Sequence, residues 1–94
     1  MLYIDEWYWD DENRAHLGEH GLKPGHVYQV FREAPRFRGN LAGRTATHQM
    51  IGPDVTGTIL VFCILQTNLR PGLWKVITGW EAEEDEEEWY YHGG

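Results

Sequence analysis

Three polar side chains near the N-terminus have a spacing that could build a reactive site. Asn13, His16 and His20 stand at i, i+3 and i+7, which places them on one side of an α-helix. The two histidines are one turn apart and could chelate zinc or copper, but no cysteine cluster and no HExxH motif accompanies them. We therefore predict neither a metal nor a cofactor, and favour a row of hydrogen-bonded side chains that holds the helix in place.

A histidine and an arginine suggest a second kind of chemistry. If residues 44 to 51 form a strand, the period of two places Arg44 and His48 on the same face. Such a pair can cleave RNA without a metal, because the imidazole transfers a proton and the guanidinium group stabilises negative charge on the phosphate. We therefore select His48 and Arg44 as candidate catalytic residues, with an exposed strand face that has no catalytic role as the simpler alternative. The cations that could bind RNA beside them are Arg36, Arg38 and Lys75.

The charge of the chain is distributed unevenly. The net charge is −7, and seven of the fifteen acidic residues lie between positions 81 and 88, so residues 1 to 80 hold eight acidic and eight basic residues. Four arginines fall within thirteen positions, and they can form a surface for a polyanion or pair with the acidic segment. The acidic segment itself can be a solvated tail, a clamp over these arginines, or a mimic of nucleic acid directed at a partner. The four arginines are Arg32, Arg36, Arg38 and Arg44.

The overall composition is that of one folded domain. Among the 94 residues, 41% are hydrophobic and 14% are aromatic, which favours a packed chain over a disordered one. Cys63 is the only cysteine and stands within the apolar stretch ILVFCIL, so we expect a core residue and a reducing compartment. No secretory signal is visible, and the apolar run from 59 to 65 is too short to span a bilayer. We expect a cytoplasmic protein without membrane contact.

Turn and capping residues divide the chain into seven elements. Asp10 is a favourable N-cap and Gly21 a favourable stop for a first helix, while Pro24 suits the first turn of a second helix and Pro35 ends it. The resulting order, β-α-α-β-β-β-α, predicts a small α+β domain over residues 1–94, with an antiparallel sheet whose first strand lies at an edge. The predicted segments are strands 2–8, 44–51, 58–66 and 73–80 and helices 11–20, 23–35 and 81–91.

The stretch WDDENRAHLGEHGL resembles the N-terminal signature of the BrnT toxin family. Further along, GRTATHQMIG, GTILVFCI and WKVITGWEA resemble that family's three strands and the start of its last helix. The resemblance covers nearly the whole chain and implies a RelE-like fold with a curved antiparallel sheet. It also implies a bacterial type II toxin–antitoxin system on a mobile or chromosomal element, in which a metal-independent ribonuclease is neutralised by a DNA-binding antitoxin of the ribbon-helix-helix type. The signature falls on Trp9, Asp10, Asn13, His16, His20, Gly21 and Leu22.

Two departures from that family concern activity. Toxin members usually carry a lysine before the His-Gly pair, where this chain has Glu19, and an arginine with a basic helix after the last strand, where it has Trp80 and then acids. Phosphate contacts supply much of the affinity for nucleic acid, so we expect weaker RNA binding.

Two hypotheses from different classes follow. The leading one is a BrnT-like protein that acts on RNA or descends from proteins that do. The alternative is a non-catalytic module that binds a protein through its aromatic or acidic surface. A homodimer remains open, as does a small-molecule pocket lined by the five tryptophans, although indoles more often fill a core.

Overall fold

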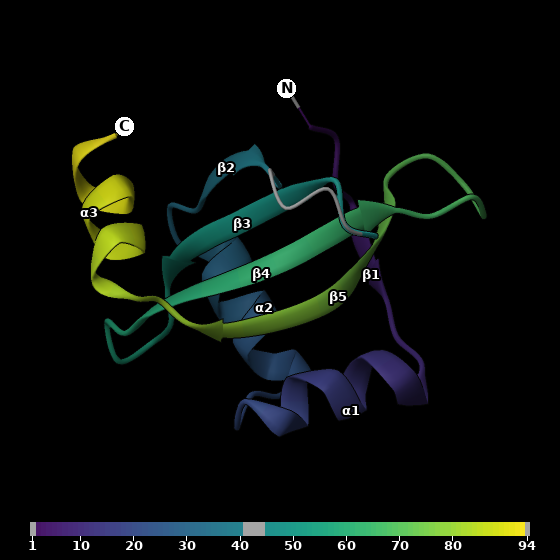
Figure 1. Ribbon diagram of the computed structural model, residues 1–94. Helices are drawn as coiled ribbons and strands as arrows, with labels where there is room; N and C mark the ends of the chain where they lie inside the picture. Colours follow the sequence, from purple (N-terminus) through teal and green to yellow (C-terminus); the bar gives the residue numbers. More distant parts are fainter. Residues whose placement is uncertain (1, 41–44, 94) are drawn as a thin grey trace.

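The computed structural model describes residues 2–40 and 45–93 and arranges them in five strands and three helices (Figure 1). The predicted α+β class is confirmed, and the observed order, β-α-α-β-β-β-β-α, contains one strand more than predicted. None of the described helices is long and apolar enough to cross a membrane. In chain order the elements are β1 (Glu6–Tyr8), α1 (Asp11–Glu19), α2 (Pro24–Arg32), β2 (Arg36–Gly39), β3 (His48–Pro53), β4 (Ile59–Gln66), β5 (Leu73–Glu81) and α3 (Glu84–His92).

All five strands belong to one sheet, in the order β1-β5-β4-β3-β2. The three pairs that join β2, β3, β4 and β5 are antiparallel, as predicted for the sheet, and β1 lies at an edge. The expectation of a wholly antiparallel sheet is wrong for β1, which pairs with β5 in parallel. Parallel pairing requires a long connection, and here most of the chain lies between the two strands.

Several element boundaries differ from those predicted. β1 has three residues rather than the expected seven, and α2 ends at Arg32 because the residue before Pro35 is excluded from helical conformation. The predicted strand 44–51 corresponds to β3, which begins at His48 and continues to Pro53; residue 44 lies outside the described residues. The sequence analysis missed β2, since its four residues include two arginines and a glycine and only pairing with β3 makes them a strand.

One face of the sheet, here called the helix face, is covered by α1 and α2 (Figure 1). Leu17 of α1 and Val27 of α2 are fully buried against Met50 and Phe62 of the sheet. Gly79 is required beside this core, because a Cβ there would lie 2.5 Å from the ring of Phe62. The main hydrophobic core of the described chain therefore lies between these two helices and the central strands.

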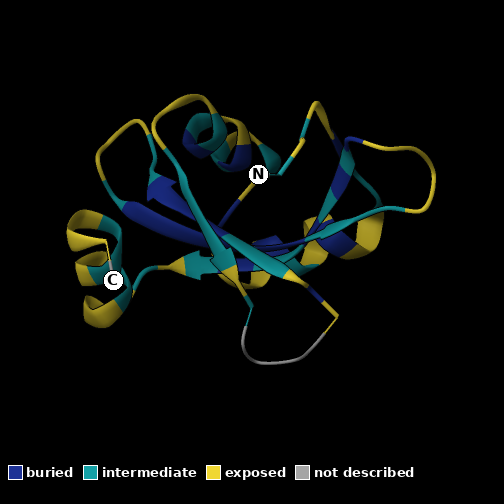
Figure 2. Cartoon of the chain, turned by 90° about the horizontal axis from the view of Figure 1, so that it is seen from above, coloured by how far each residue is buried: buried dark blue, intermediate teal, exposed yellow. Residues whose placement is uncertain are grey.

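The opposite face carries Arg36 and Arg38 and is here called the arginine face. At one end of it, α3 lies over a smaller cluster in which Ile51, Ile59 and Val61 are buried. The helix itself remains peripheral: Figure 2 shows it in exposed and intermediate colours, and none of its residues is buried. The two faces are thus covered to very different depths.

Candidate functional site

The side chain of Asn13 fixes the start of α1. Asn13 is 1% exposed, and its backbone N–H donates to Asp10 Oδ1 at 2.8 Å while Asp10 N donates to Asn13 Oδ1 at 3.0 Å. The amide Nδ2 also donates to the carbonyl oxygen of Tyr8 at 3.0 Å. The Asn13 N–H, with a smaller contribution from Lys75, holds the pKa of the Asp10 carboxyl below its usual value. Asn13 is therefore a capping residue that joins β1 to α1.

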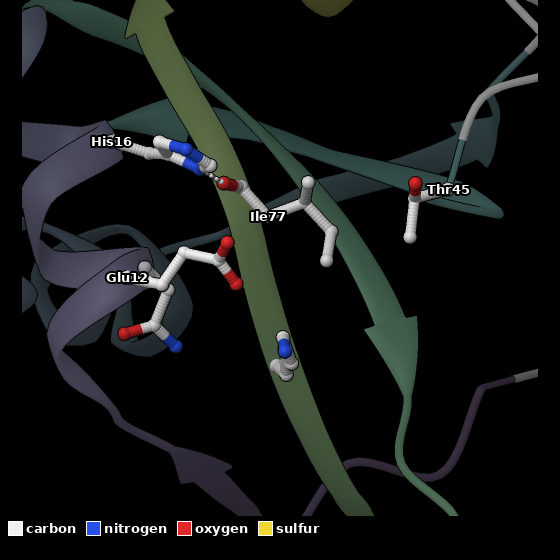
Figure 3. Close-up of a pocket in the computed structure, with 6 residues that line it drawn as sticks. Glu12, His16, Thr45 and Ile77 are labelled. Atoms are coloured by element: carbon white, nitrogen blue, oxygen red, sulfur yellow. Dashed lines mark hydrogen bonds between the residues drawn. The ribbon is translucent and has the colours of Figure 1, made fainter.

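His16 attaches the same helix to β5, at the point where the pairing of β5 with β4 is irregular. The pairing of β5 with β4 passes from Val76 to Thr78, so Ile77 is an extra residue with no partner on β4. The Ile77 carbonyl oxygen lies 3.1 Å from His16 Nδ1 (Figure 3). Because a carbonyl oxygen can only accept, Nδ1 must carry the hydrogen in this contact. His16 thus anchors α1 at the irregularity of β5.

A small cavity opens beside this anchor (Figure 3). Its volume is about 160 Å³, below the range of about 300–1,000 Å³ that is typical of ligand pockets. The ammonium group of Lys75 lies in this region, but Asp10 Oδ2 is 3.7 Å from its Nζ. The cavity is lined by Glu12, Asn13, His16, Thr45, Lys75 and Ile77. Because the carboxylates of Asp10 and Glu12 oppose the one lysine, the cavity does not favour a phosphate.

His16 of α1 and His20, the residue that caps the end of this helix, make separate contacts. The ring of His20 lies 6.5 Å from that of Trp80, whereas His16 bonds to the β5 backbone. Across residues 2–40 and 45–93, no group of three or more histidine, cysteine, aspartate or glutamate side chains is arranged to hold a metal ion. Asn13 and His16 serve to position α1, as the row of hydrogen-bonded side chains predicted.

His48 lies on the helix face, away from the arginines. It pairs with Ile64 and, by the alternation of β3, shares a face with Met50. Its Nδ1 is 2.9 Å from Thr47 Oγ1, and its ring centroid is 5.7 Å from that of Trp74. A cavity of about 590 Å³ beside it is lined by Leu2, Phe37, Arg38, Gly39 and His48.

Arg36 and Arg38 lie on the arginine face because they pair with Ile51 and Gln49, which alternate with His48 along β3. The Arg38 Nε donates to Gln49 Oε1 at 2.8 Å, so its guanidinium group is directed away from the imidazole. Lys75 alternates with Trp74 and Val76 of the helix-face core, so it lies on the arginine face, but near the β1 edge, where its Nζ is 3.7 Å from Asp10 Oδ2. Arg44 lies outside the described residues. The structure therefore brings Arg36 and Arg38 together on one face and places His48 on the other, although Arg38 and His48 both line the cavity of about 590 Å³ at the β2 edge.

Both guanidinium groups contact α3. Their central carbons lie 4.6 and 4.7 Å from the ring centroid of Trp89, within the distance of cation–π interactions. Arg36 Nη1 also donates to the carbonyl oxygens of Trp89 and Tyr90, each at 3.0 Å. Within the described chain neither arginine forms a salt bridge with a carboxylate. Among the described residues the carboxylates of positions 81–88 therefore do not pair with these arginines. The contacts come from the ring of Trp89 and the main-chain oxygens of Trp89 and Tyr90, which follow that segment.

A further cavity on the arginine face lies next to Gln49, the hydrogen-bond partner of Arg38. Its volume is about 340 Å³, and Gln49, which accepts the Arg38 hydrogen bond, lies in its wall. Burial raises the pKa of the Cys63 thiol in the same wall, so the thiol is a poor nucleophile at neutral pH. The described lining is Asn40, Thr45, Ala46, Gln49, Cys63, Ile77, Thr78 and Trp80.

Gln49, Asn40 and Trp89 were not predicted from the sequence to belong to this site. The sequence did contain a signal for the two arginines at the centre of the site. Arg36 and Arg38 are separated by a single residue, the spacing that places two side chains on one face of a strand. The contact with Trp89 had no such signal, because 51 or more positions separate the ring from either arginine.

Comparison with known proteins found no family for this sequence. No protein-family model matches the sequence, and no curated protein matches it. The resemblance to the BrnT toxins therefore stays a prediction that rests on the residues quoted above.

Proposed function

We propose that this protein is BrnT-like, with a RelE-like fold, and binds single-stranded RNA on its arginine face as a toxin-related member of a toxin–antitoxin system. The observation that carries the RNA proposal is the position of Arg36 and Arg38, side by side on β2 with both guanidinium groups over one aromatic ring. Guanidinium planes stack on the bases of unpaired RNA and also bind phosphate oxygens. A surface that holds a flat ring between cationic groups suits that ligand.

The adjoining cavity supports the same ligand. Its volume of about 340 Å³ falls within the range of about 300–1,000 Å³ found for small-molecule sites. The side chains of Asn40, Gln49 and Thr78 line it. Asn40 Nδ2 already donates to the Ala46 carbonyl oxygen and Gln49 Oε1 already accepts from Arg38 Nε, so a base would use the remaining capacity of these amides and the Thr78 hydroxyl group. A base can therefore be recognised beside the arginines that bind its backbone.

Binding is better supported than cleavage. His48, the candidate proton-transfer residue, lies on the helix face, and the Lys75 ammonium group is beside Asp10. A general base must reach the proton that it removes. His48 projects from the helix face, and of the two arginines only Arg38 lines the same cavity, at the β2 edge. We propose that RNA is bound at this surface without being cut.

A titration with labelled single-stranded RNA tests the binding site. The double substitution Arg36→Ala, Arg38→Ala should weaken binding and flatten the slope of log K against log salt by about 1.4, since each lost phosphate contact on a single strand contributes about 0.7. The matched control is Arg14→Ala, Arg32→Ala, which removes the same charge from exposed positions on α1 and α2. Equal losses in the two double variants would reduce the effect to net charge and contradict the proposed site.

Incubation with total bacterial RNA in EDTA tests cleavage. We expect intact RNA with the native protein and with the variant Arg44→Ala, His48→Ala. Cleavage by the native protein alone would establish a metal-independent ribonuclease, and would assign its reaction to Arg44 and His48 instead.

The acidic surface of α3 favours a second function, protein binding. Four of its carboxylates, those of Glu84, Asp85, Glu87 and Glu88, are exposed, and only Glu88 has an ion pair among the described residues, at 3.9 Å from His92. A basic partner, such as a ribbon-helix-helix antitoxin, would suit this surface. If the protein still folds and still captures a co-expressed antitoxin after removal of residues 81–94, protein binding through the surface of α3 is excluded.

A further inference from the structure

We infer that Trp89 and the C-terminal end of α3 occupy the RNA site of the arginine face, so that α3 and an unpaired nucleotide compete for Arg36 and Arg38. The inference rests on the RNA-binding function proposed above and adds its regulation. In the conformation described here α3 covers the site, and RNA binds when α3 is displaced.

α3 offers these arginines the same two kinds of group that a nucleotide offers. The Trp89 indole supplies a flat ring to both guanidinium groups, in the position that a stacked base would take. The carbonyl oxygens of Trp89 and Tyr90 accept from Arg36 Nη1 at the negative end of the helix dipole, where a nucleotide would place phosphate oxygens. α3 and the nucleotide would use the same guanidinium faces and the same Arg36 N–H groups. They therefore exclude each other.

The fit between the end of α3 and Arg36 is close. Gly93 has a φ of +67°, and a Cβ at this position would lie 2.9 Å from Arg36 Nη1. The Tyr90 hydroxyl group donates to the Ala34 carbonyl oxygen at 2.6 Å, just before β2. The last turn of α3 is therefore built around the arginine, in addition to the packing of Trp89 and Tyr90 against the buried cluster beneath the helix.

The hold on α3 is nevertheless weak enough to be broken. None of its nine residues is buried, and six consecutive acidic residues, at positions 83 to 88, precede Trp89. Like charges one turn apart, such as Glu84 and Glu88, repel each other along the helix. One carboxylate is tied to the sheet, where Glu86 accepts from Trp80 Nε1 at 3.0 Å. The docked helix also places this negative charge beside the arginines, which opposes RNA until the helix leaves.

Amide hydrogen exchange of the native protein tests the competition without any substitution. Saturating single-stranded RNA should accelerate exchange in residues 84–92 while slowing or leaving unchanged exchange in β3 and β4. Unchanged or slower exchange in α3 at saturation would overturn the inference. So would a polyglutamate peptide that accelerates exchange in α3 where RNA does not, since the competing ligand would then be an acidic protein.

Substitution of Trp89 gives the second measurement. Trp89→Ala removes the ring that both arginines contact, so the affinity for a labelled single-stranded RNA should rise about tenfold, the equivalent of two cation–π contacts. The matched control is Tyr91→Ala, an aromatic residue of the same helix that is 62% exposed, and its affinity should stay at the native value. Adding Arg36→Ala and Arg38→Ala to the Trp89 variant should abolish the gain.

The outcomes separate this inference from the function on which it rests. If the native protein and the Trp89 variant bind RNA equally, and both need the two arginines, RNA binding holds and competition by α3 is wrong. If neither binds RNA although exchange shows α3 released in the variant, the proposed function itself is wrong. If Trp89→Ala still raised the affinity for RNA after both arginines had been replaced, the RNA would bind elsewhere and the inference would be overturned.

Discussion

α1 and α3 have nine residues each, yet α1 buries two side chains, Asn13 and Leu17, and α3 buries none. α1 is fixed at its start by a reciprocal cap and along its length by the bond from His16 to β5. α3 is held at its end, where the carbonyl oxygens and ring of Trp89 meet two arginines. The first helix is attached in part through fully buried side chains, and the last only through side chains that remain partly or fully accessible.

This difference separates the part of the protein that maintains the fold from the part that can exchange partners. Buried apolar contacts are lost only when the chain unfolds, whereas a partly exposed arginine can trade one aromatic ring for another. The helix face therefore acts as the structural layer. The arginine face, with its detachable helix, is the layer on which we place function.

The largest effect should come from the helix face. Leu17 is fully buried in the core beneath α1, and Leu17→Ala should lower the free energy of unfolding by about 3 kcal/mol because it leaves a cavity. Urea denaturation measures the change. Leu69→Ala is the control, since this leucine is 68% exposed and its loss should cost little. If Leu17→Ala lowered the free energy of unfolding by less than Trp89→Ala does, the proposed roles of the two faces would be reversed.

A smaller effect is expected on the arginine face. Trp89→Ala should lower the free energy that holds α3 in place by about 1–2 kcal/mol, the value of two partly exposed cation–π contacts. Amide exchange in residues 84–92 should rise about tenfold or more, while exchange in β4 should change little. Equal acceleration in β4 would show that α3 and the core unfold together.

Charge within α3 should have a still smaller effect. Glu88→Lys replaces a repulsive pair with Glu84 by an attractive one, four residues apart, and should stabilise α3 by about 0.5 kcal/mol. Exchange in α3 should slow about twofold at low salt. Glu88→Gln removes the repulsion together with the 3.9 Å contact to His92, and should give at most half of the gain. If high salt left both effects unchanged, charge would not be their cause.

The smallest effect concerns acid and the cap of α1. The Asn13 N–H lowers the pKa of Asp10 below the ordinary value of 3.8. The cap therefore contributes stability above that ordinary value, and the contribution is lost as the pH falls through the lowered pKa of the folded state. The urea midpoint of the native protein should fall more steeply in acid than that of Asp10→Asn, whose amide caps the helix without titrating. Parallel profiles would show that this contact is not linked to acid stability.

Local patterns were enough where neighbours in the sequence make the contacts. Asp10, Asn13 and Gly21 mark both ends of α1 because caps join residues a few positions apart. β4 was recognisable from its unbroken apolar run, which predicts burial on both faces, and Cys63 lies within it as a core residue. The grouping of Arg36 and Arg38 also follows from their spacing.

Partnerships across the chain could only be decided by the folded structure. β2 exists because it pairs with β3, and the register of that pairing sends His48 to one face and the two arginines to the other. A shift of one residue would have reversed this assignment, since side chains alternate along a strand. The sequence determined which residues carry charge and which helices can form. Tertiary structure alone decided that both arginines meet Trp89, because that contact depends on the path of the whole sheet between them.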